Sequence, residues 1–474
     1  MATKKLASWA LALQFSNLTQ PVTDMAVKSI YNWAGCAIGG YALPPAGVAL
    51  EALSPLLPQN SGNCSILGSD VFVDVQTAAL VNGIASHVDD YDDTHADTPV
   101  HPSGPVASAL LAMAELKAPV SGRDFIAAFV AGVEAECKLG LAVYPEHYDI
   151  GWRKWLVPKR GSRIRSVTQY ANSCLDITST TGSIGAAVAV GKLLGLNLEQ
   201  LQHAISIASV QVIGMRDSFG TDTKPFHVGR AAQSGILAAV LAQNGYGGSL
   251  EGLEAKYGWA HVVSTRQNVT QELSTLGKTW EITKNTFKPF PCDRIIHAAI
   301  DGWIEIHDQA AKKGLNVTDI KNVTARTNPM VLSLTDNHNP KTGLDAKFSV
   351  YHAAAVALIY GKATPAQFTD DLVKSPTVIN IRDKVNVTAD KGVSEHEAFV
   401  AVEFKDGTKL DVHVEQALGS IEKPLSTKQL KEKFLEQVST QIGKKQADAA
   451  FKEFSQIANA TDVGKIARKF KRYA

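Results

Sequence analysis

The 474-residue sequence is poor in cysteine, and the cysteines it has are scattered. None of the five forms a Cys-X-X-Cys pair, and an odd number leaves one thiol over: Cys36, Cys64, Cys137, Cys174 and Cys292. This argues against a disulfide framework or a zinc site and favours a reducing compartment. The N-terminal residues predict an amphipathic helix rather than a signal peptide. We therefore expect an intracellular protein, cytoplasmic or mitochondrial, that is not secreted.

An excess of charge of one sign and long apolar runs are also missing. Lysine plus arginine number 47 and aspartate plus glutamate 46, so the formal net charge is +1 with histidine neutral. Such a balance creates no field that attracts nucleic acid or an anionic membrane. No stretch approaches 18 uninterrupted apolar residues, so no membrane span is predicted. We expect neither nucleic acid nor membrane as a partner.

Common motifs for nucleotide, metal and nucleophilic chemistry are absent as well. The sequence has no His-Glu-X-X-His and no Gly-X-Ser-X-Gly motif. Gly182–Lys192 is rich in glycine but lacks Walker spacing, and no strand precedes it, so it indicates close helix packing. We expect no cofactor and no metal.

The chain is long enough for two domains, since single cores usually stop growing at roughly 250–300 residues. Up to about residue 265, Ala- and Leu-rich stretches alternate with Gly, Pro, Asn and Asp, which predicts helices nearly throughout. The apolar helical stretches are Val106–Leu116, Phe125–Leu139, Ile184–Leu194, Leu201–Ile213 and Gly229–Gln243. Many are apolar on all sides, which is typical of helices buried in a large all-α body.

The pattern changes after Thr279. Residues 323–327 predict a strand, and Ala398–Phe404 and Lys409–Val414 alternate in period 2 around a Lys-Asp-Gly turn, which predicts a hairpin. Helices with charged faces follow from Ser426, a predicted N-cap. The predicted fold is mainly α, with a large all-α helical domain, a smaller α+β lid domain and C-terminal helices that return to the helical domain, at residues 1–279, 280–415 and 416–474.

Ionisable residues are densest at His87–His95, where four aspartates lie within five residues. Their repulsion must be relieved by protonation, pairing or a cation. If the Asp90–Thr94 segment is helical, these two residues share a face. His101 precedes a helix start marked by Ser103, which suits a substrate carboxylate. A solvated acidic helix end is the alternative, and a magnesium site of the isoprenoid-synthase kind is another, although no second metal motif accompanies it.

A second group of cations lies at Thr223–Arg230, before an apolar helix expected from Ala231 onward. It includes Lys224 and His227 and could form another anion site, although such cations are usually surface residues. Lys347 and His297 belong to two further polar motifs that are uninformative without context.

Taken together, these motifs resemble the MmgE/PrpD family in order and spacing, almost from end to end. The family includes 2-methylcitrate dehydratase, cis-aconitate decarboxylase and iminodisuccinate epimerase. The resemblance implies a helical domain and a lid domain around a polar pocket, a homodimer, and catalysis without a cofactor. The motifs that carry it are His87–Gly104, Thr223–Gly235, Phe287–Gly302 and Gly343–Leu358.

Position by position, the resemblance implies catalytic roles for Asp90, Thr94, His101 and Lys224. Lys224 and His101 would bind carboxylates and stabilise charge. Asp90 would orient a cation or act as a base, and Thr94 would hydrogen-bond the substrate. The predicted substrate-binding residues are His227, His297 and Lys347.

The sequence departs from the family at a Gly-Trp-His motif. Gly151-Trp152 is followed by Arg153, and the familiar Ile-Thr-Ser-Thr continuation appears only after Asp176. Arg153-Lys154 can be encoded with a 5′ splice signal, and Leu175-Asp176 with the terminal AG of an intron. Removing the 23 codons of 153–175, or 69 nucleotides, keeps the frame and creates the missing histidine. We predict that this basic segment is a translated intron and that the chain as written is poorly active.

The expected function is that of a lyase acting on a small polycarboxylic acid. Loss of CO2 from an aconitate or alkyl-aconitate ranks first, because the His-Ala-Asp-Thr-Pro-Val-His-Pro-Ser-Gly stretch looks closer to the decarboxylase branch. Loss of water from 2-methylcitrate or another alkylcitrate ranks next, followed by isomerisation or epimerisation. A non-catalytic binding homologue is the alternative of another class, and an alkylated substrate of secondary metabolism is plausible.

Overall fold

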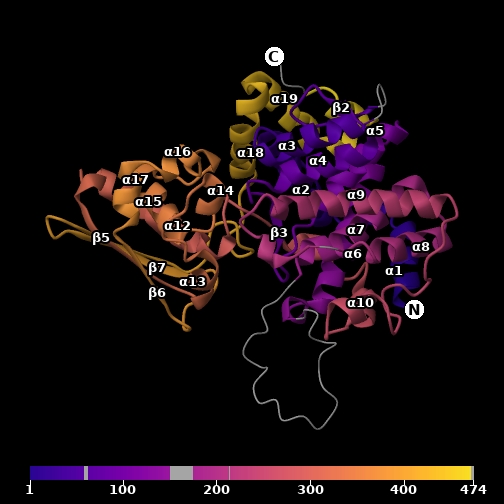
Figure 1. Cartoon of the computed structure of the whole chain (residues 1–474), viewed down its shortest axis with the longest axis horizontal. Helices are drawn as coiled ribbons and strands as arrows, with labels where there is room; N and C mark the ends of the chain where they lie inside the picture. Colours follow the sequence, from indigo (N-terminus) through magenta and orange to yellow (C-terminus); the bar gives the residue numbers. More distant parts are fainter. Residues whose placement is uncertain (58–61, 150–174, 213, 471–474) are drawn as a thin grey trace, which may run out of the picture. The chain divides into compact units, whose positions relative to one another are not determined.

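The computed structural model describes residues 1–57, 62–149, 175–212 and 214–470, which form two compact units (Figure 1). Unit 1 comprises Met1–Val88, Asp92–Asn285 and Leu430–Ala474, and unit 2 comprises Asp89–Tyr91 and Thr286–Gln429. The predicted intron, 153–175, lies outside the described residues except for Leu175, which forms a β-bridge with Met215. The mainly α fold is confirmed.

Unit 1 is built almost entirely of helices. Its centre is α7, which packs against α6 and α9 (Figure 1). A methyl group at Gly235 of α9 would come within 2.4 Å of Ala186 of α7, and one at Gly185 within 2.9 Å of the Gly132 carbonyl of α6. The predicted close helix packing of the glycine-rich stretch is therefore confirmed. The principal helices are α1 (Ala2–Ala12), α2 (Gln20–Gly40), α3 (Pro44–Leu53), α4 (Val75–His87), α5 (Ser103–Lys117), α6 (Gly122–Val143), α7 (Ile177–Leu194), α8 (Leu198–Ser209), α9 (Thr223–Gln243), α18 (Thr427–Ile442) and α19 (Lys444–Ser455).

Helix α7 is also long and apolar enough to cross a membrane, judged by length and composition alone. Of its 18-residue window, 89% is buried inside the protein. A core helix surrounded by other helices has this same composition. A second candidate, Gln20–Gly40 with Pro44–Leu56, is bent by 76° at its break.

Unit 2 contains a four-stranded sheet in the order β6-β5-β7-β8. Strand β5 (Ile320–Thr327) pairs in parallel with β6 (Val385–Ala389) and antiparallel with β7 (Ala398–Phe404). Strands β7 and β8 (Lys409–Val414) form the predicted hairpin with the predicted bounds, and Gly407 in its turn has a φ of 88°. The strand predicted at residues 323–327 is likewise confirmed within β5.

The inner face of this sheet is covered by α12 (His297–Lys312), which contacts β7 and β8. Buried and less buried residues alternate along β7, so that every second side chain enters the core. A methyl group at Gly302 of α12 would come within 2.5 Å of Val400, so this glycine lets the helix approach the sheet closely. Beyond α12 lies α15 (Val350–Tyr360), a short and almost completely buried helix.

The chain passes into unit 2 after Asn285 and returns at Leu430. Ser426 caps α18, accepting a hydrogen bond at 3.2 Å from the Gln429 N–H, as predicted. One local prediction was wrong. Helix α9 begins at Thr223 rather than Ala231, because residues before Ala231, such as His227 and Val228, are already buried. Helix α5 begins at Ser103, as predicted, and the Ser103 hydroxyl donates to Asp93.

Candidate active site

The four aspartates at the end of α4 lie in a loop, not in a helix. Helix α4 ends at His87, and Asp90 has a φ of 51°, a left-handed conformation that interrupts any helical continuation. Asp90 and Thr94 therefore do not share a helix face, and that part of the prediction was wrong. All four carboxyl groups have partners among the described residues: Asp92 and Asp93 in unit 1, and Asp89 and Asp90 in unit 2.

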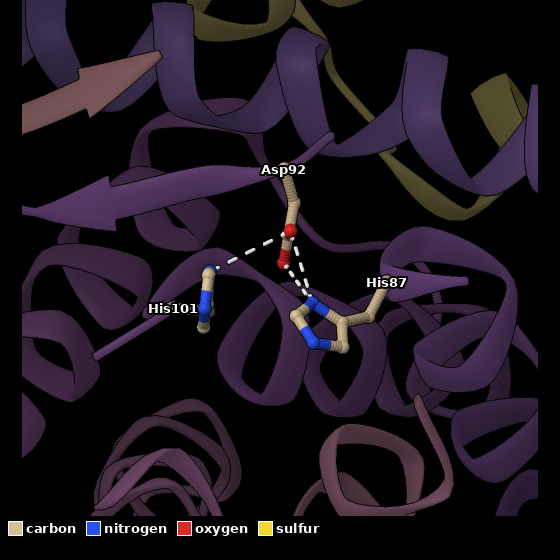
Figure 2. Close-up of side chains that lie close together, drawn as sticks. All are labelled: His87, Asp92 and His101. Carbon is tan, nitrogen blue, oxygen red and sulfur yellow. Dashed lines mark hydrogen bonds and ion pairs between the residues drawn. The ribbon is translucent and has the colours of Figure 1, made fainter. Parts of the chain in front are cut away.

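In unit 1, Asp92 lies between two histidines (Figure 2). Nδ1 of His87, at the end of α4, lies 2.9 Å from both Asp92 carboxylate oxygens. Nδ1 of His101, just before α5, lies 3.5 Å from Asp92 Oδ1. The two rings meet edge to face, with centroids 4.6 Å apart. The buried carboxylate thus orients one imidazole by a hydrogen bond and faces the other.

The orientation of His101 follows from its backbone contacts. Its Nδ1 lies 2.9 Å from the Asp93 carbonyl oxygen, which only accepts, so Nδ1 must carry the proton. Thr94 Oγ1 lies 3.3 Å from the same nitrogen, and the His101 N–H donates to Thr178 Oγ1 at 3.1 Å. In the neutral ring, Nε2 is then the basic nitrogen. Thr94 and His101, both predicted to be catalytic, thus lie next to each other.

A second histidine–carboxylate pair lies at the amino end of α7. Asp176 caps this helix, accepting a hydrogen bond at 3.0 Å from the Thr178 N–H through Oδ1. Its Oδ2 lies 2.9 Å from Nδ1 of His227, which comes from α9. Both side chains are buried. His227, predicted to bind substrate, is therefore fixed by a carboxylate.

The two pairs belong to one electrostatic environment. Burial raises the pKa of Asp176, but the hydrogen bond from His227 and the charges of His227, His101 and His87 outweigh it. The pKa of Asp176 is therefore below its ordinary value. We call the residues that share this environment the histidine cluster: His87, Asp92, His101, Asp176 and His227.

Two further carboxyl groups beside the histidine cluster hold protons tightly. Burial and the charge of Asp92 raise the pKa of Asp93 to about 7, against the hydrogen bonds that Ser103 and Asn285 donate to it. Burial, followed by the charges of Asp93 and Asp176, raises the pKa of Glu136 well above its ordinary range. No described residue hydrogen-bonds the Glu136 carboxyl oxygens. The site thus combines ionised carboxylates that hold histidines with carboxyl groups that retain protons near neutral pH.

Lys224 lies in the first turn of α9, one turn before His227 and on the same helix face. Its ammonium group is 5.1 Å from the centre of the Phe219 ring, within reach of a cation–π interaction. It is partly exposed, unlike His227. The cationic motif thus lies in the first turns of α9, and its His227 is hydrogen-bonded to Asp176.

In unit 2, two lysines hold the remaining aspartates. Lys288 Nζ lies 3.0 Å from Asp90 Oδ1, and Lys347 Nζ lies 2.6 Å from Asp89 Oδ1. All four side chains are at most 13% exposed. Buried charges require such partners because desolvation is costly. Asp90 is therefore placed to orient a cation, one of the two roles that the family resemblance implies.

His297, at the start of α12, lies deeper in unit 2. Burial and the charge of Lys288 lower the pKa of its imidazole to about 3, so it is neutral. Its Nε2 lies 3.3 Å from the Cys292 carbonyl, and its ring packs edge to face on Phe290. This environment favours a structural role for His297 over the predicted substrate binding, which stays a prediction.

Two groups of side chains have the geometry to hold a cation. The candidate ligand atoms of each group lie within 4.8 Å of one another. Their histidine Nδ1 atoms are already engaged, by Asp92 and Asp93 in one group and by Thr98 in the other. The groups are His87, Asp92 and His101, and His95, Asp97 and Glu281.

Sequence reasoning missed several members of the site. Lys288 stands in a motif that was recognised, but nothing in the pattern distinguished it from a surface lysine. Asp176 was noticed only as the residue after the anomalous segment. Glu136 is one polar residue in an otherwise apolar helix, and an ionisable residue on a buried face is the signal that could have identified it.

An α-helical body that buries histidine–carboxylate pairs beside protonated carboxyl groups is suited to acid–base enzymes. Comparison with known proteins agrees. The MmgE/PrpD N-terminal domain matches residues 4–272, and the MmgE/PrpD C-terminal domain matches residues 290–457. The chain belongs to the MmgE/PrpD family.

Individual relatives are similar over most of their length. The chain is 25% identical to the cis-aconitate decarboxylase-like protein oryM of Aspergillus oryzae, covering 98% of this chain and 96% of that protein. It is 28% identical to human cis-aconitate decarboxylase, over 91% of this chain and 86% of the human protein. Similarity to 2-methylcitrate dehydratase of Escherichia coli, at 25% identity, covers 50% of this chain and 52% of that enzyme.

Proposed function

We propose that this protein is a cofactor-independent lyase that removes CO2 from cis-aconitate or an alkyl-substituted aconitate. The observation that carries the proposal is the histidine cluster, in which Asp92 orients His87 and the Asp93 carbonyl orients His101 by hydrogen bonds. The near full-length similarity to proteins named as cis-aconitate decarboxylases supports this reaction over others.

Decarboxylation leaves the electron pair of the broken C–C bond on carbon, from where it spreads towards a retained carboxylate. The site must stabilise that charge and then supply a proton. In our proposal, Lys224 and the imidazoles of His101 and His227 bind carboxylates. The histidine that the predicted splice creates, in its imidazolium form, then donates the proton to that carbon, and Thr94 hydrogen-bonds the substrate. The Asp90–Lys288 pair supports a cation-orienting role for Asp90, and Lys347 stays a proposed carboxylate-binding residue.

Dehydration of an alkylcitrate is the second candidate. It needs a base for a C–H and an acid for the leaving hydroxyl group. A carboxyl group with a pKa of about 7, such as Asp93, suits the second task. The similarity to 2-methylcitrate dehydratase over half of the chain supports dehydration as the second candidate.

One experiment distinguishes the two reactions. The chain with residues 153–175 removed and Asp176→His is incubated with cis-aconitate, citrate and 2-methylcitrate, and the products are analysed by mass spectrometry. Loss of the mass of CO2 supports the first proposal, and loss of the mass of water supports the second. Unchanged substrates in every incubation argue for a non-catalytic homologue, which calorimetric binding without turnover would identify. Full activity in a chelator is expected, since the proposed chemistry uses protein cations.

We also propose that residues 153–175 are absent from the physiological protein. Removing them by the predicted splice replaces Asp176 with histidine. The excised form is the chain that lacks residues 153–175 and carries Asp176→His. The position of Asp176 beside His227 supports the proposal, because a histidine there would join an existing histidine cluster. Sequencing cDNA between the codons of Trp152 and Ile177 decides the matter: a transcript that keeps all of the segment contradicts it.

The remaining proposals concern assembly and location. We propose a homodimer, which the family resemblance implies, to be checked by light scattering during size-exclusion chromatography. A monomer at micromolar concentration would contradict it. The four described cysteines are buried and form no disulfide with one another, which supports our proposal of an intracellular, reducing compartment. Fluorescence microscopy of a tagged protein would distinguish cytoplasm from mitochondrion.

A further inference from the structure

The amino end of α7 has the features of an anion site. Three histidines act on it, and the first N–H groups of an 18-residue helix point towards it. In this chain the anion is internal, because both carboxylate oxygens of Asp176 are bound: Oδ1 by the Thr178 N–H and Oδ2 by His227.

Capping α7 does not itself require a carboxylate. Other helices of this chain are capped by neutral side chains in the same manner: Ser349 caps α15 and Asn328 caps α13. Serine, asparagine and aspartate are nearly equivalent as N-caps. Asp176 is nevertheless ionised in its buried position, since the histidine interactions outweigh the effect of burial on its pKa.

The negative charge of Asp176 has consequences for an incoming ligand. A substrate carboxylate brought to the same histidines meets a like charge in a buried environment, where repulsion is weakly screened. The charge also reaches its neighbours, since it is one of the causes of the raised pKa of Glu136. The histidines that would bind a polycarboxylate are thus partly neutralised by the chain itself.

We propose that the Asp176 carboxylate takes the place of a substrate carboxylate at the amino end of α7 and so weakens the binding of polycarboxylates. Asp176 is then an affinity-determining residue of the chain as written. This inference rests on the proposed function, because it assumes that the histidine cluster binds a polycarboxylate. It does not depend on whether the intron proposal holds.

The test uses the full chain and isothermal titration calorimetry with cis-aconitate at pH 7. Asp176→Asn removes the charge but keeps the size and the cap, and Asp176→Ser also vacates space. Asp74→Asn is the matched control, since Asp74 caps α4 through the Gln76 and Thr77 N–H groups. We expect Kd to fall at least about tenfold in both Asp176 variants, or about 1.4 kcal/mol, and to stay unchanged in the control.

The possible outcomes distinguish a failure of this inference from a failure of the proposed function. If the unaltered chain binds cis-aconitate and both Asp176 variants bind it equally or more weakly, the inference is overturned and the function stands. If neither the unaltered chain nor any variant binds, both fail. Tighter binding in the two Asp176 variants, with no gain for the uncharged trimethyl ester of cis-aconitate, supports the inference. Thermal unfolding confirms that each variant is folded; if Asp176→Ser is not, Asp176→Asn decides alone.

Discussion

Asp93 should make the protein lose stability as pH rises from 5 to 8. Its pKa is raised from 3.8 to about 7. A group whose pKa is raised on folding contributes stability that is complete below its unfolded pKa and is lost as pH rises through its folded pKa. Between pH 5 and pH 8, this one carboxyl group should therefore lower the free energy of unfolding by about 3 kcal/mol.

The assay is urea unfolding of the unaltered chain and of Asp93→Asn at both pH values. Asparagine perturbs the hydrogen bonds with Ser103 and Asn285 equally at each pH, so that effect cancels when each protein is compared with itself. Between pH 5 and pH 8, we expect the free energy of unfolding to fall by about 3 kcal/mol more in the unaltered chain than in Asp93→Asn. The same substitution at Asp74 controls for the loss of a carboxyl group. Equal pH dependence of the unaltered chain and Asp93→Asn would refute the reasoning.

Three further predictions concern single side chains. In the excised form, Lys224→Ala should raise KM for cis-aconitate about tenfold or more, because a charged hydrogen bond contributes roughly 1.5–3 kcal/mol; unaltered kinetics would remove Lys224 from the site. In the same form, His227→Asn should also raise KM about tenfold or more, whereas His203→Asn on α8 should not; equal effects would contradict the carboxylate-binding role assigned to His227. Lys288→Met should destabilise the fold by about 3–5 kcal/mol, because the buried Asp90 loses the lysine that pairs with it. Adding Asp90→Asn should recover most of this stability. If Lys288→Met alone leaves stability unchanged, the pair is not important.

Much of the fold could be predicted because its signals are local. Period-2 alternation on either side of Lys405-Asp406-Gly407 defined the hairpin of unit 2, and Ser426 marked the start of α18. The early start of α9 was missed because Lys224 and His227 are polar, although His227 is buried in the folded chain. The left-handed conformation of Asp90 was missed because it depends on contacts with distant residues such as Lys288.

The site was predictable in outline but not in its pairings. Family motifs pointed to Asp90, His101 and Lys224 as candidates, yet they could not say that Asp90 pairs with Lys288. The pairing of Asp176 with His227 joins residues 51 positions apart. Only the packing of α7 against α9 brings them together, and no local pattern in the sequence encodes that contact.

The most direct test is to incubate the excised form with cis-aconitate carrying isotopic carbon in each carboxyl group, in the presence of a chelator. Our account predicts release of labelled CO2 together with a dicarboxylic acid, and loss of both when His101 is replaced by asparagine. Intact cis-aconitate, or turnover that survives the loss of His101, would contradict it.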